Sequence, residues 1–319
     1  MRVLLTGGSG FVGQAIRVRL MADGMCSLRV VFRRLPTDLP AALEARVAPE
    51  LSPDSNWREE LVRVDSVIHC AARVHVMNEQ AVDPLAEFRR VNVEGTLNFA
   101  RQAAGAGVRR FIFISSIKVN GEGTLRGEPY DSEAMGDPVD PYGISKMEAE
   151  LGLRTISFET GMEVVIIRPV LVYGPGVKAN FLSLMRWLHK GVPLPFGSID
   201  NHRSLVALDN LVDLIVTCIG HPAAANQTFL VSDGEDLSTT ELLRRMGMAL
   251  GKPARLLPVP KWLIERGAVI LGKQALAQRL CGSLQVDINK SRELLGWVPP
   301  VSVDEALRRT AEHFLAQQK

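Results

Sequence analysis

MRVLLTGGSGFVG, residues 1–13, joins a short apolar run to a glycine-rich turn. Arg2–Thr6 has the pattern of a buried β-strand, and Phe11–Met21 has the pattern of a helix. The glycines between them, spaced GxxGxxG, allow a tight turn, close approach of a phosphate and close packing of the helix on the strand. Backbone N–H groups and the positive end of the helix then face a ligand, which favours a dinucleotide pyrophosphate over a purely structural turn. The predicted contacts are Gly7, Gly10, Phe11, Val12 and Gly13.

The rest of the first half continues to alternate strands and helices. This alternation predicts an α/β fold with a doubly wound parallel sheet of the Rossmann type. Further strands are predicted at Leu28–Phe32, Ser66–Cys70, Arg109–Ser115 and Glu163–Arg168, and helices at Pro84–Ala104 and Tyr142–Glu159. A loop rich in glycine and proline, residues 121–141, precedes the second of these helices.

The pattern changes after Pro175, where prolines and glycines separate shorter helices. These helices are predicted at Asn180–His189, Asp209–Ile219, Ser238–Leu250 and Val303–Phe314, with a strand at Leu205–Ala207. We therefore expect a dinucleotide-binding domain at 1–175 and a smaller substrate-binding α/β lobe at 176–319. The two are expected to interleave, so that the chain can cross back to the first.

Composition argues against several classes of function. Hydrophobic residues make up 46% of the 319 residues and charged residues 23%, the balance of a soluble globular protein. The 37 Lys and Arg are dispersed and nearly balanced by 35 Asp and Glu, so neither a nucleic-acid nor an anionic-membrane partner is expected. Four cysteines without CxxC spacing favour reduced thiols. With no signal-peptide pattern and no apolar stretch near the ~20 residues that span a bilayer, a cytoplasmic protein without a metal site is expected.

The end of the second strand bears on the choice of cofactor. An acidic residue there accepts hydrogen bonds from a ribose hydroxyl, whereas arginine can hold a 2′-phosphate. This chain has Arg33 and Arg34, which favours NADP(H) over NAD(H). The alternative is a solvated arginine pair with no role in binding.

Tyr142 and Lys146 lie four residues apart in the sequence YGISK. On a helix they share one face, about 5–6 Å apart at Cβ, so an ammonium can lie beside a phenol. Such a pair suits proton transfer at a redox cofactor. Bringing the phenol pKa from near 10 to ~7 takes about 4 kcal/mol, which a lysine and an oxidised nicotinamide can supply together.

Several motifs together resemble the extended short-chain dehydrogenase/reductase family. They are GGSGFVG, IHCAA (68–72), VNVEGT with Asn92, Ser115-Ser116, YGISK, RPVLVYGPG (168–176) and LLGWVP (294–299). Within that family the chain is most similar to UDP-sugar 4-epimerases and 4-keto-sugar reductases of bacterial O-antigen and polysaccharide pathways. The resemblance covers nearly the whole chain.

The resemblance implies roles for individual residues. Ser116 matches the residue that hydrogen-bonds the sugar C4 oxygen, Tyr142 the acid/base, and Lys146 its partner, which also binds the nicotinamide ribose. Further cofactor contacts are implied for Glu50, Leu51, Ala71, Ala72, Asn92 and Pro169. Contacts to the UDP-sugar are implied for Asn180, Arg203 and Arg279, although any one arginine could instead be a surface ion-pair partner. Asn92 could equally be a structural tie. A homodimer through helices 84–104 and 142–159 is also implied.

Departures from the family pattern narrow the reaction. Sugar 4,6-dehydratases carry Asp-Glu directly after the catalytic Ser/Thr, where this chain has Ile117 and Lys118, so dehydration is not expected. Asn120 and Leu171 replace a tyrosine and an asparagine of many relatives, which leaves the sugar contacts open.

Three functions remain. The first is reduction of a UDP-4-keto-6-deoxy-N-acetylhexosamine by NAD(P)H, which Arg33 slightly favours. The second is 4-epimerisation of UDP-glucose or UDP-N-acetylglucosamine with retained NAD. The third, a silent NADP-sensing protein of the same fold, predicts loss of the Tyr-Lys pair, which is present.

Overall fold

The first lobe is built on a seven-stranded sheet. The computed structural model describes residues 1–74, 83–272 and 274–318. The strands are β1 (Arg2–Thr6), β2 (Ser27–Phe32), β3 (Glu44–Val47), β4 (Ser66–His69), β5 (Arg110–Ile114), β6 (Glu163–Pro169) and β9 (Thr228–Val231). Their order is β3-β2-β1-β4-β5-β6-β9, and every neighbouring pair is parallel. This confirms the predicted doubly wound sheet.

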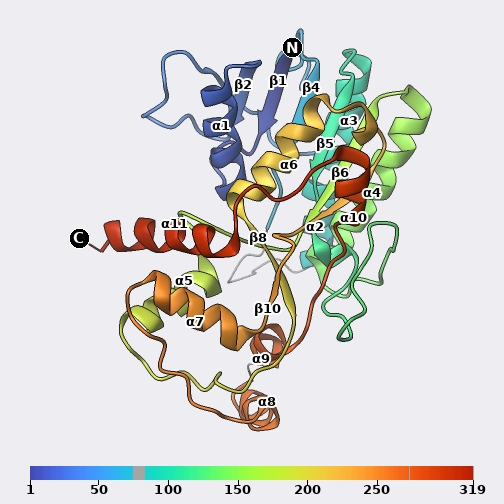
Figure 1. Cartoon of the computed structure of the whole chain (residues 1–319). Helices are drawn as coiled ribbons and strands as arrows, with labels where there is room; N and C mark the ends of the chain where they lie inside the picture. Colours follow the sequence, from blue (N-terminus) through green and yellow to red (C-terminus); the bar gives the residue numbers. More distant parts are fainter. Residues whose placement is uncertain (75–82, 273, 319) are drawn as a thin grey trace.

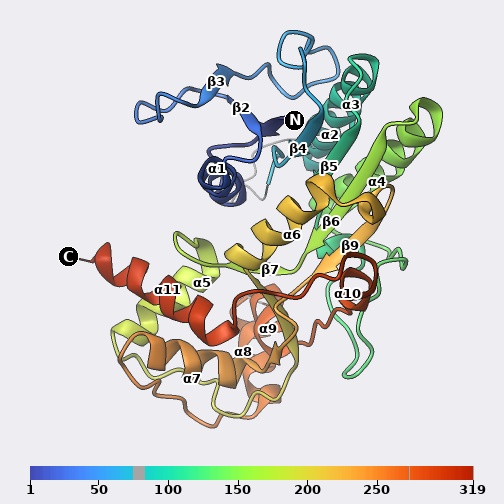
Figure 2. The same cartoon turned by 45° about the horizontal axis from the view of Figure 1, so that its top comes forward.

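Helices cover both faces of this sheet (Figures 1 and 2). On one face lie α1 (Phe11–Asp23) and α6 (Leu208–Gly220), whose Ile16 and Leu211 are buried against the strands. On the other face lie α3 (Thr96–Gly105) and α4 (Pro141–Thr160), with Phe99 and Leu153 in a second core. Both faces being covered explains why the strands are continuously apolar rather than alternating.

The helix predicted at Pro84–Ala104 is interrupted. It forms α2 (Pro84–Phe88), a π-helical segment (Arg89–Gly95) and then α3. Two tertiary contacts accompany the change of winding: Asn92 is buried, and a Cβ on Gly95 would lie 2.8 Å from the Leu51 carbonyl carbon. A π-helical segment of this kind often marks a functional site.

The second lobe has its own small sheet and core. Strands β7 (Leu171–Tyr173), β8 (Arg203–Ala207) and β10 (Asp236–Leu237) are ordered β10-β8-β7. The helices of this lobe are α5 (Ala179–His189), α7 (Thr239–Ala249), α8 (Lys261–Ile270), α9 (Gln274–Cys281) and α11 (Val303–Ala316), whereas α10 (Asn289–Leu295) packs on β9 of the first lobe. Buried side chains of α5, α7 and α11, such as Phe181, Leu243 and Leu307, form the core of this lobe.

The chain crosses back to the first lobe after entering the second. Helix α6 and strand β9 both come after residue 175, yet they belong to the first lobe: α6 covers one face of the seven-stranded sheet, and β9 pairs with β6 at its edge. Within the described residues, no helix combines the length and the apolar character needed to cross a bilayer. All four cysteines are free thiols.

Candidate active site

The glycine turn after β1 is packed too closely for side chains. Gly7 has φ +72°, and a Cβ on it would lie 2.8 Å from the Ala71 nitrogen. A Cβ on Gly13 would lie 2.2 Å from the Gly7 carbonyl oxygen. The start of α1 and the segment after β4 are thereby drawn together at the carboxyl edge of the sheet, where α/β folds bind ligands.

The first turn of α1 is suited to an anion. Within the described residues, no side chain caps this helix, and its first turn carries no acidic residue. The N–H groups of Phe11, Val12 and Gly13 precede the first intrahelical bond, from the Gln14 nitrogen to the Gly10 oxygen at 2.9 Å. These donors and the positive end of the helix fit the pyrophosphate of a dinucleotide.

The other cofactor residues expected from the sequence lie at the same edge of the sheet. Arg33 and Arg34 directly follow β2 and are exposed, and Ala71 and Ala72 follow β4. Glu50 is exposed and forms an ion pair with Arg90 at 3.3 Å.

A buried hydrogen-bond chain, which the sequence analysis missed, anchors the segment after β4. The Ala71 N–H donates to Thr6 Oγ1 at 3.2 Å, and this hydroxyl lies 2.8 Å from His69 Nδ1. The other ring nitrogen of His69 lies 3.1 Å from Thr96 Oγ1. Burial lowers the pKa of His69 to about 3, with a smaller contribution from Lys146, so the ring is neutral at pH 7. A histidine between two threonines carries no signal in one sequence.

Asn92 ties three parts of the first lobe together. Its amide donates to the Arg73 carbonyl and to Ser145 Oγ, both at 3.0 Å, and its Oδ1 accepts from the Arg73 N–H at 2.7 Å. Ser145 is the residue before Lys146, so Asn92 fixes the π-helical segment against the catalytic part of α4. Both the cofactor role and the structural role considered for Asn92 are compatible with this position.

Ser116, Tyr142 and Lys146 converge from β5 and α4. Ser116 begins a short 3₁₀ turn (Ile117–Val119), and its Oγ accepts from the Lys118 N–H at 3.3 Å. Lys146 Nζ donates to the Ile114 carbonyl at 2.8 Å and lies 5.8 Å from the centre of the Tyr142 ring. The ammonium therefore lies beneath the phenol, while Ser116 and Tyr142 both line the pocket described below.

The surroundings of Tyr142 and Lys146 within the protein change both pKa values in the direction that disfavours a tyrosinate. Burial raises the pKa of Tyr142 to about 12, and Asp140 adds to this rise. Burial lowers the pKa of Lys146 to about 8, against the smaller opposing effects of Cys70 and Glu150. The sequence predicts that Lys146 and an oxidised nicotinamide together lower the pKa of the Tyr142 phenol, and the protein groups without the cofactor do not lower it. Additional positive charge is required.

A fully buried ion pair supports the catalytic helix from below. Glu150 and Arg168 are 0% exposed and are joined by three hydrogen bonds of 2.6–3.2 Å. Ser115, next to Ser116, also donates to Glu150. Arg168 donates to Asn120 Oδ1 at 3.0 Å. Asn120 is thus a buried anchor of the 121–141 loop and does not line the pocket described below, whereas Leu171 does.

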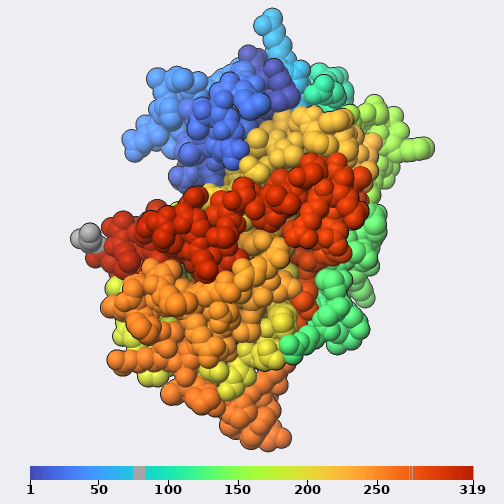
Figure 3. All heavy atoms as spheres, viewed as in Figure 1, coloured from blue at the N-terminus to red at the C-terminus, as the bar shows by residue number. Residues whose placement is uncertain are grey.

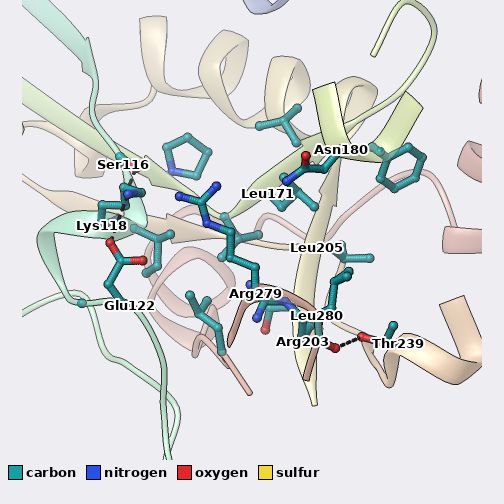
Figure 4. Close-up of a pocket in the computed structure, with 18 of the residues that line it drawn as sticks. Ser116, Lys118, Glu122, Leu171, Asn180, Arg203, Leu205, Thr239, Arg279 and Leu280 are labelled. Atoms are coloured by element: carbon teal, nitrogen blue, oxygen red, sulfur yellow. Dashed lines mark hydrogen bonds and ion pairs between the residues drawn. The ribbon is translucent and has the colours of Figure 1, made fainter. Parts of the chain in front are cut away.

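A pocket of about 440 Å³ lies between the two lobes and collects the expected substrate residues (Figure 4). Ser116, Tyr142 and Pro169 line it from the first lobe, and Asn180 and Arg203 from the second. Leu171, Leu205 and Arg279 complete much of the wall, and the Arg279 side chain reaches into the middle of the space.

The second-lobe end of the pocket is positive. Burial lowers the pKa of Arg203, and the nearby Arg279 guanidinium lowers it further. Two guanidinium groups this close favour an anionic ligand between them, because their mutual repulsion is then relieved. Arg203 is oriented by a 3.0 Å hydrogen bond to the Gly282 carbonyl.

Three charged residues of the pocket wall were missed as site residues. Lys118 Nζ donates to Asp140 Oδ2 at 2.9 Å and to Glu122 Oε1 at 3.0 Å. Asp140 also caps α4 by accepting from the Gly143 N–H at 3.2 Å. The sequence Asp140-Pro141 is a recognisable N-cap signal that could have located this carboxylate.

Comparison with known proteins agrees with this geometry. Residues 3–232 match the model of the NAD dependent epimerase/dehydratase family. The chain is 50% identical over 314 residues to a UDP-glucose 4-epimerase of Vibrio cholerae, covering 98% of this chain and 95% of that protein.

Two solved structures share the fold over the full length of both chains. They are a UDP-glucose 4-epimerase of Thermotoga maritima with UDP-glucose (TM-score 0.78, 23% identity) and a UDP-glucuronic acid 4-epimerase of Bacillus cereus with NAD (TM-score 0.80, 17% identity). The chain therefore belongs to the NAD-dependent epimerase/dehydratase family.

Proposed function

We propose that this protein is a UDP-hexose 4-epimerase that interconverts UDP-glucose and its C4 epimer with retained NAD. The observation that carries the proposal is the 50% identity to the Vibrio cholerae UDP-glucose 4-epimerase, which extends over 98% of this chain. Arg33 slightly favours 4-keto reduction, whereas this relative favours the alternative, 4-epimerisation.

The pocket supports the proposal by its distribution of charge. In our proposal the hexose lies at the first-lobe end, within reach of Ser116 and Tyr142, and the diphosphate lies between Arg203 and Arg279. Asn180, at the start of α5, contributes an amide on the same side of the pocket. The apolar wall formed by Leu171 and Leu205 leaves room for a sugar to turn, because it offers no side-chain hydrogen bond to one orientation.

The cofactor fits the edge of the sheet described above. NAD, when bound, supplies reversible hydride transfer at C4. The α1 turn from Gly7 to Gly13 would hold its pyrophosphate, and Lys146 its nicotinamide ribose. Arg33 and Arg34 favour NADP(H), but we propose NAD because the family is NAD-dependent and the Bacillus cereus structure contains NAD.

The proton at the C4 oxygen is assigned to Tyr142. The Tyr142 phenolate oxygen would take the proton of the C4 hydroxyl when C4 is oxidised and would return a proton to that oxygen when C4 is reduced from the opposite face. Ser116 donates a hydrogen bond to the C4 oxygen throughout. Lys146, together with the positive charge of the oxidised cofactor, stabilises the phenolate that burial disfavours.

The experiment for this proposal uses the purified protein without added cofactor. We expect denaturation to release close to one NAD⁺ per chain. We also expect UDP-glucose to be converted to UDP-galactose until the two reach equilibrium. If the protein holds no nucleotide, and conversion does not occur even when NAD⁺ is supplied, the epimerase assignment fails.

The second candidate is 4-keto reduction, which the Arg33-Arg34 pair favours. It predicts oxidation of NADPH by a UDP-4-keto-6-deoxy-N-acetylhexosamine. It also predicts that Arg33→Asp shifts the preference from NADPH toward NADH, and an unchanged preference would remove its support.

A further inference from the structure

Several large apolar side chains that point into solvent are gathered in the segment around α8. Within residues 257–271 the exposed apolar side chains are Leu257, Trp262, Leu263, Val269, Ile270 and Leu271. Ile270 is 84% exposed and Trp262 53%. We call this set, with the basic residues named next, the α8 surface. A cluster of this size on a water-soluble domain marks an interaction site more often than chance exposure does.

Basic residues accompany these apolar side chains in the sequence. Lys261 and Arg266 are exposed on α8 itself, and Lys252 and Arg255 are exposed in the segment that precedes it, whereas the only acidic residue from 251 to 272 is Glu265. Arg266 lies over the Trp262 ring at 5.3 Å, and Glu265 is 3.7 Å from Lys261. The near-neutral balance of the whole chain therefore conceals a local positive excess, which the dispersed distribution seen in the sequence did not reveal.

The α8 surface lies at the outer end of the second lobe. In Figure 1, α8 lies at the end of the second lobe farthest from the seven-stranded sheet, and the space-filling view in Figure 3 shows this orange segment protruding. Helix α8 packs on α9, which supplies Arg279 and Leu280 to the pocket wall. The surface is thus both accessible and connected to the site.

We propose that the α8 surface docks the protein on an anionic membrane. A tryptophan, bulky aliphatic side chains and basic residues exposed on and beside one short helix match the groups that bind lipid interfaces: the apolar side chains enter the headgroup region and the cations pair with acidic lipids. A second copy of the chain fits less well, because pairing the surface with itself would place its positive charges against one another.

Vesicle sedimentation tests this inference with the full-length protein. We expect binding to vesicles of phosphatidylglycerol and phosphatidylethanolamine, weak binding to phosphatidylcholine alone, and loss of binding at high salt. Lys261→Glu with Arg266→Glu should weaken binding by roughly tenfold or more, and Trp262→Ser with Ile270→Ser should do the same. The matched control is Phe158→Ser, which removes a 93% exposed apolar side chain from α4 in the other lobe and should leave binding unchanged.

Two results would overturn the proposal. One is absence of binding to acidic vesicles, or binding that both α8 double variants retain. The other is a dimer in sedimentation equilibrium that Trp262→Ser with Ile270→Ser dissociates, which would assign the surface to a second copy. Turnover of soluble UDP-glucose should stay within twofold in all variants. Absence of UDP-glucose turnover in the wild-type protein would contradict the proposed function, but it would not bear on the proposal that the α8 surface binds membranes.

Discussion

Tyr142 occupies the first turn of α4, with Lys146 beneath it and Ser116 across the pocket. The sequence located all three, because YGISK and the strand-end serines are local patterns. It did not indicate how strongly burial disfavours the phenolate. That effect depends on Phe88, Asp140 and the other side chains that the fold brings around the ring, and their packing is not encoded in a local motif.

Replacing Tyr142 with phenylalanine tests the acid/base role. We expect Tyr142→Phe to lower kcat by ~10²–10⁴-fold, because a positioned proton-transfer group contributes about that much. Bound NAD and the melting temperature should change little. Tyr130→Phe is the control, since Tyr130 donates only to the Gly123 carbonyl at the surface. Turnover within a few-fold of wild type in Tyr142→Phe would show that another group moves the proton.

His69 offers a prediction about pH. Its folded-state pKa of about 3 lies below the unfolded value of about 6.5, so the unfolded chain binds more protons between these values. The stability that depends on a neutral His69 is present above pH 6.5 and declines as pH falls toward 3. By pH 5 this loss is about 2 kcal/mol.

Urea unfolding at pH 7 and pH 5 measures this effect. The decrease in unfolding free energy should be smaller in His69→Gln than in wild type, whereas His313→Gln, in the partly exposed α11, should behave as wild type does. An identical pH dependence in His69→Gln and wild type would rule out a buried neutral histidine at this position.

At the scale of elements, α4 combines capping, catalysis and anchoring. Asp140 caps it, Tyr142 and Lys146 line its working face, and Glu150 anchors it to Arg168 of β6. Four-residue spacing aligns the last three on one side of the helix. The sequence predicted the helix and its catalytic pair, but Glu150 resembled any helical glutamate, because its partner lies 18 residues away on a strand.

Two glutamates on α4, Glu150 and Glu148, allow the contribution of a buried ion pair to stability to be compared with that of a partly exposed one. Glu150→Gln should lower the unfolding free energy by about 3–5 kcal/mol, because Arg168 would keep a buried charge without its counter-ion. Glu148→Gln removes a partly exposed pair with Arg89 and should have only a small effect. Denaturant unfolding of both variants gives the comparison. Equal losses would mean that the buried pair is not a main support of this helix.

Helices and strands were predicted correctly where a local sequence pattern determines them. The prediction failed where tertiary contacts determine the backbone conformation. The strand Arg2–Thr6 has the predicted bounds, and Phe11–Asp23 extends the predicted helix by two residues. The π-helical segment at Arg89–Gly95 depends on Asn92 and Gly95 meeting distant backbone, so helical periodicity could not reveal it. Strands as short as β7 and β10 lie below the length at which alternation can be recognised.

At the scale of the molecule, the two lobes supply opposite ends of one pocket. The first lobe supplies Ser116 and Tyr142, and the second supplies Asn180, Arg203 and Arg279. Motif resemblance named these residues, but only the fold brings segments more than 160 positions apart to the same cavity. The homodimer expected through the α2–α3 and α4 helices stays a prediction.

Replacing Arg203 tests whether the second lobe binds the diphosphate while the first lobe carries out the reaction at C4. Because a diphosphate is bound equally in the ground and transition states, Arg203→Ala should raise KM for the UDP-sugar by roughly tenfold or more and leave kcat nearly unchanged. Arg126→Ala, which removes an exposed partner of Asp200, should change neither. A large fall in kcat with unchanged KM would show that Arg203 acts in the reaction at C4 and does not bind the diphosphate.

In the proposed epimerisation, hydride leaves C4 and returns to the same carbon within one protein molecule. The most direct test is to incubate UDP-glucose deuterated at C4 with the purified protein, without added cofactor, and to analyse the product by mass spectrometry and NMR. We expect UDP-galactose that retains deuterium at C4. UDP-galactose with hydrogen at C4, or no UDP-galactose while a 4-keto-sugar is reduced at the expense of NADPH, would contradict it.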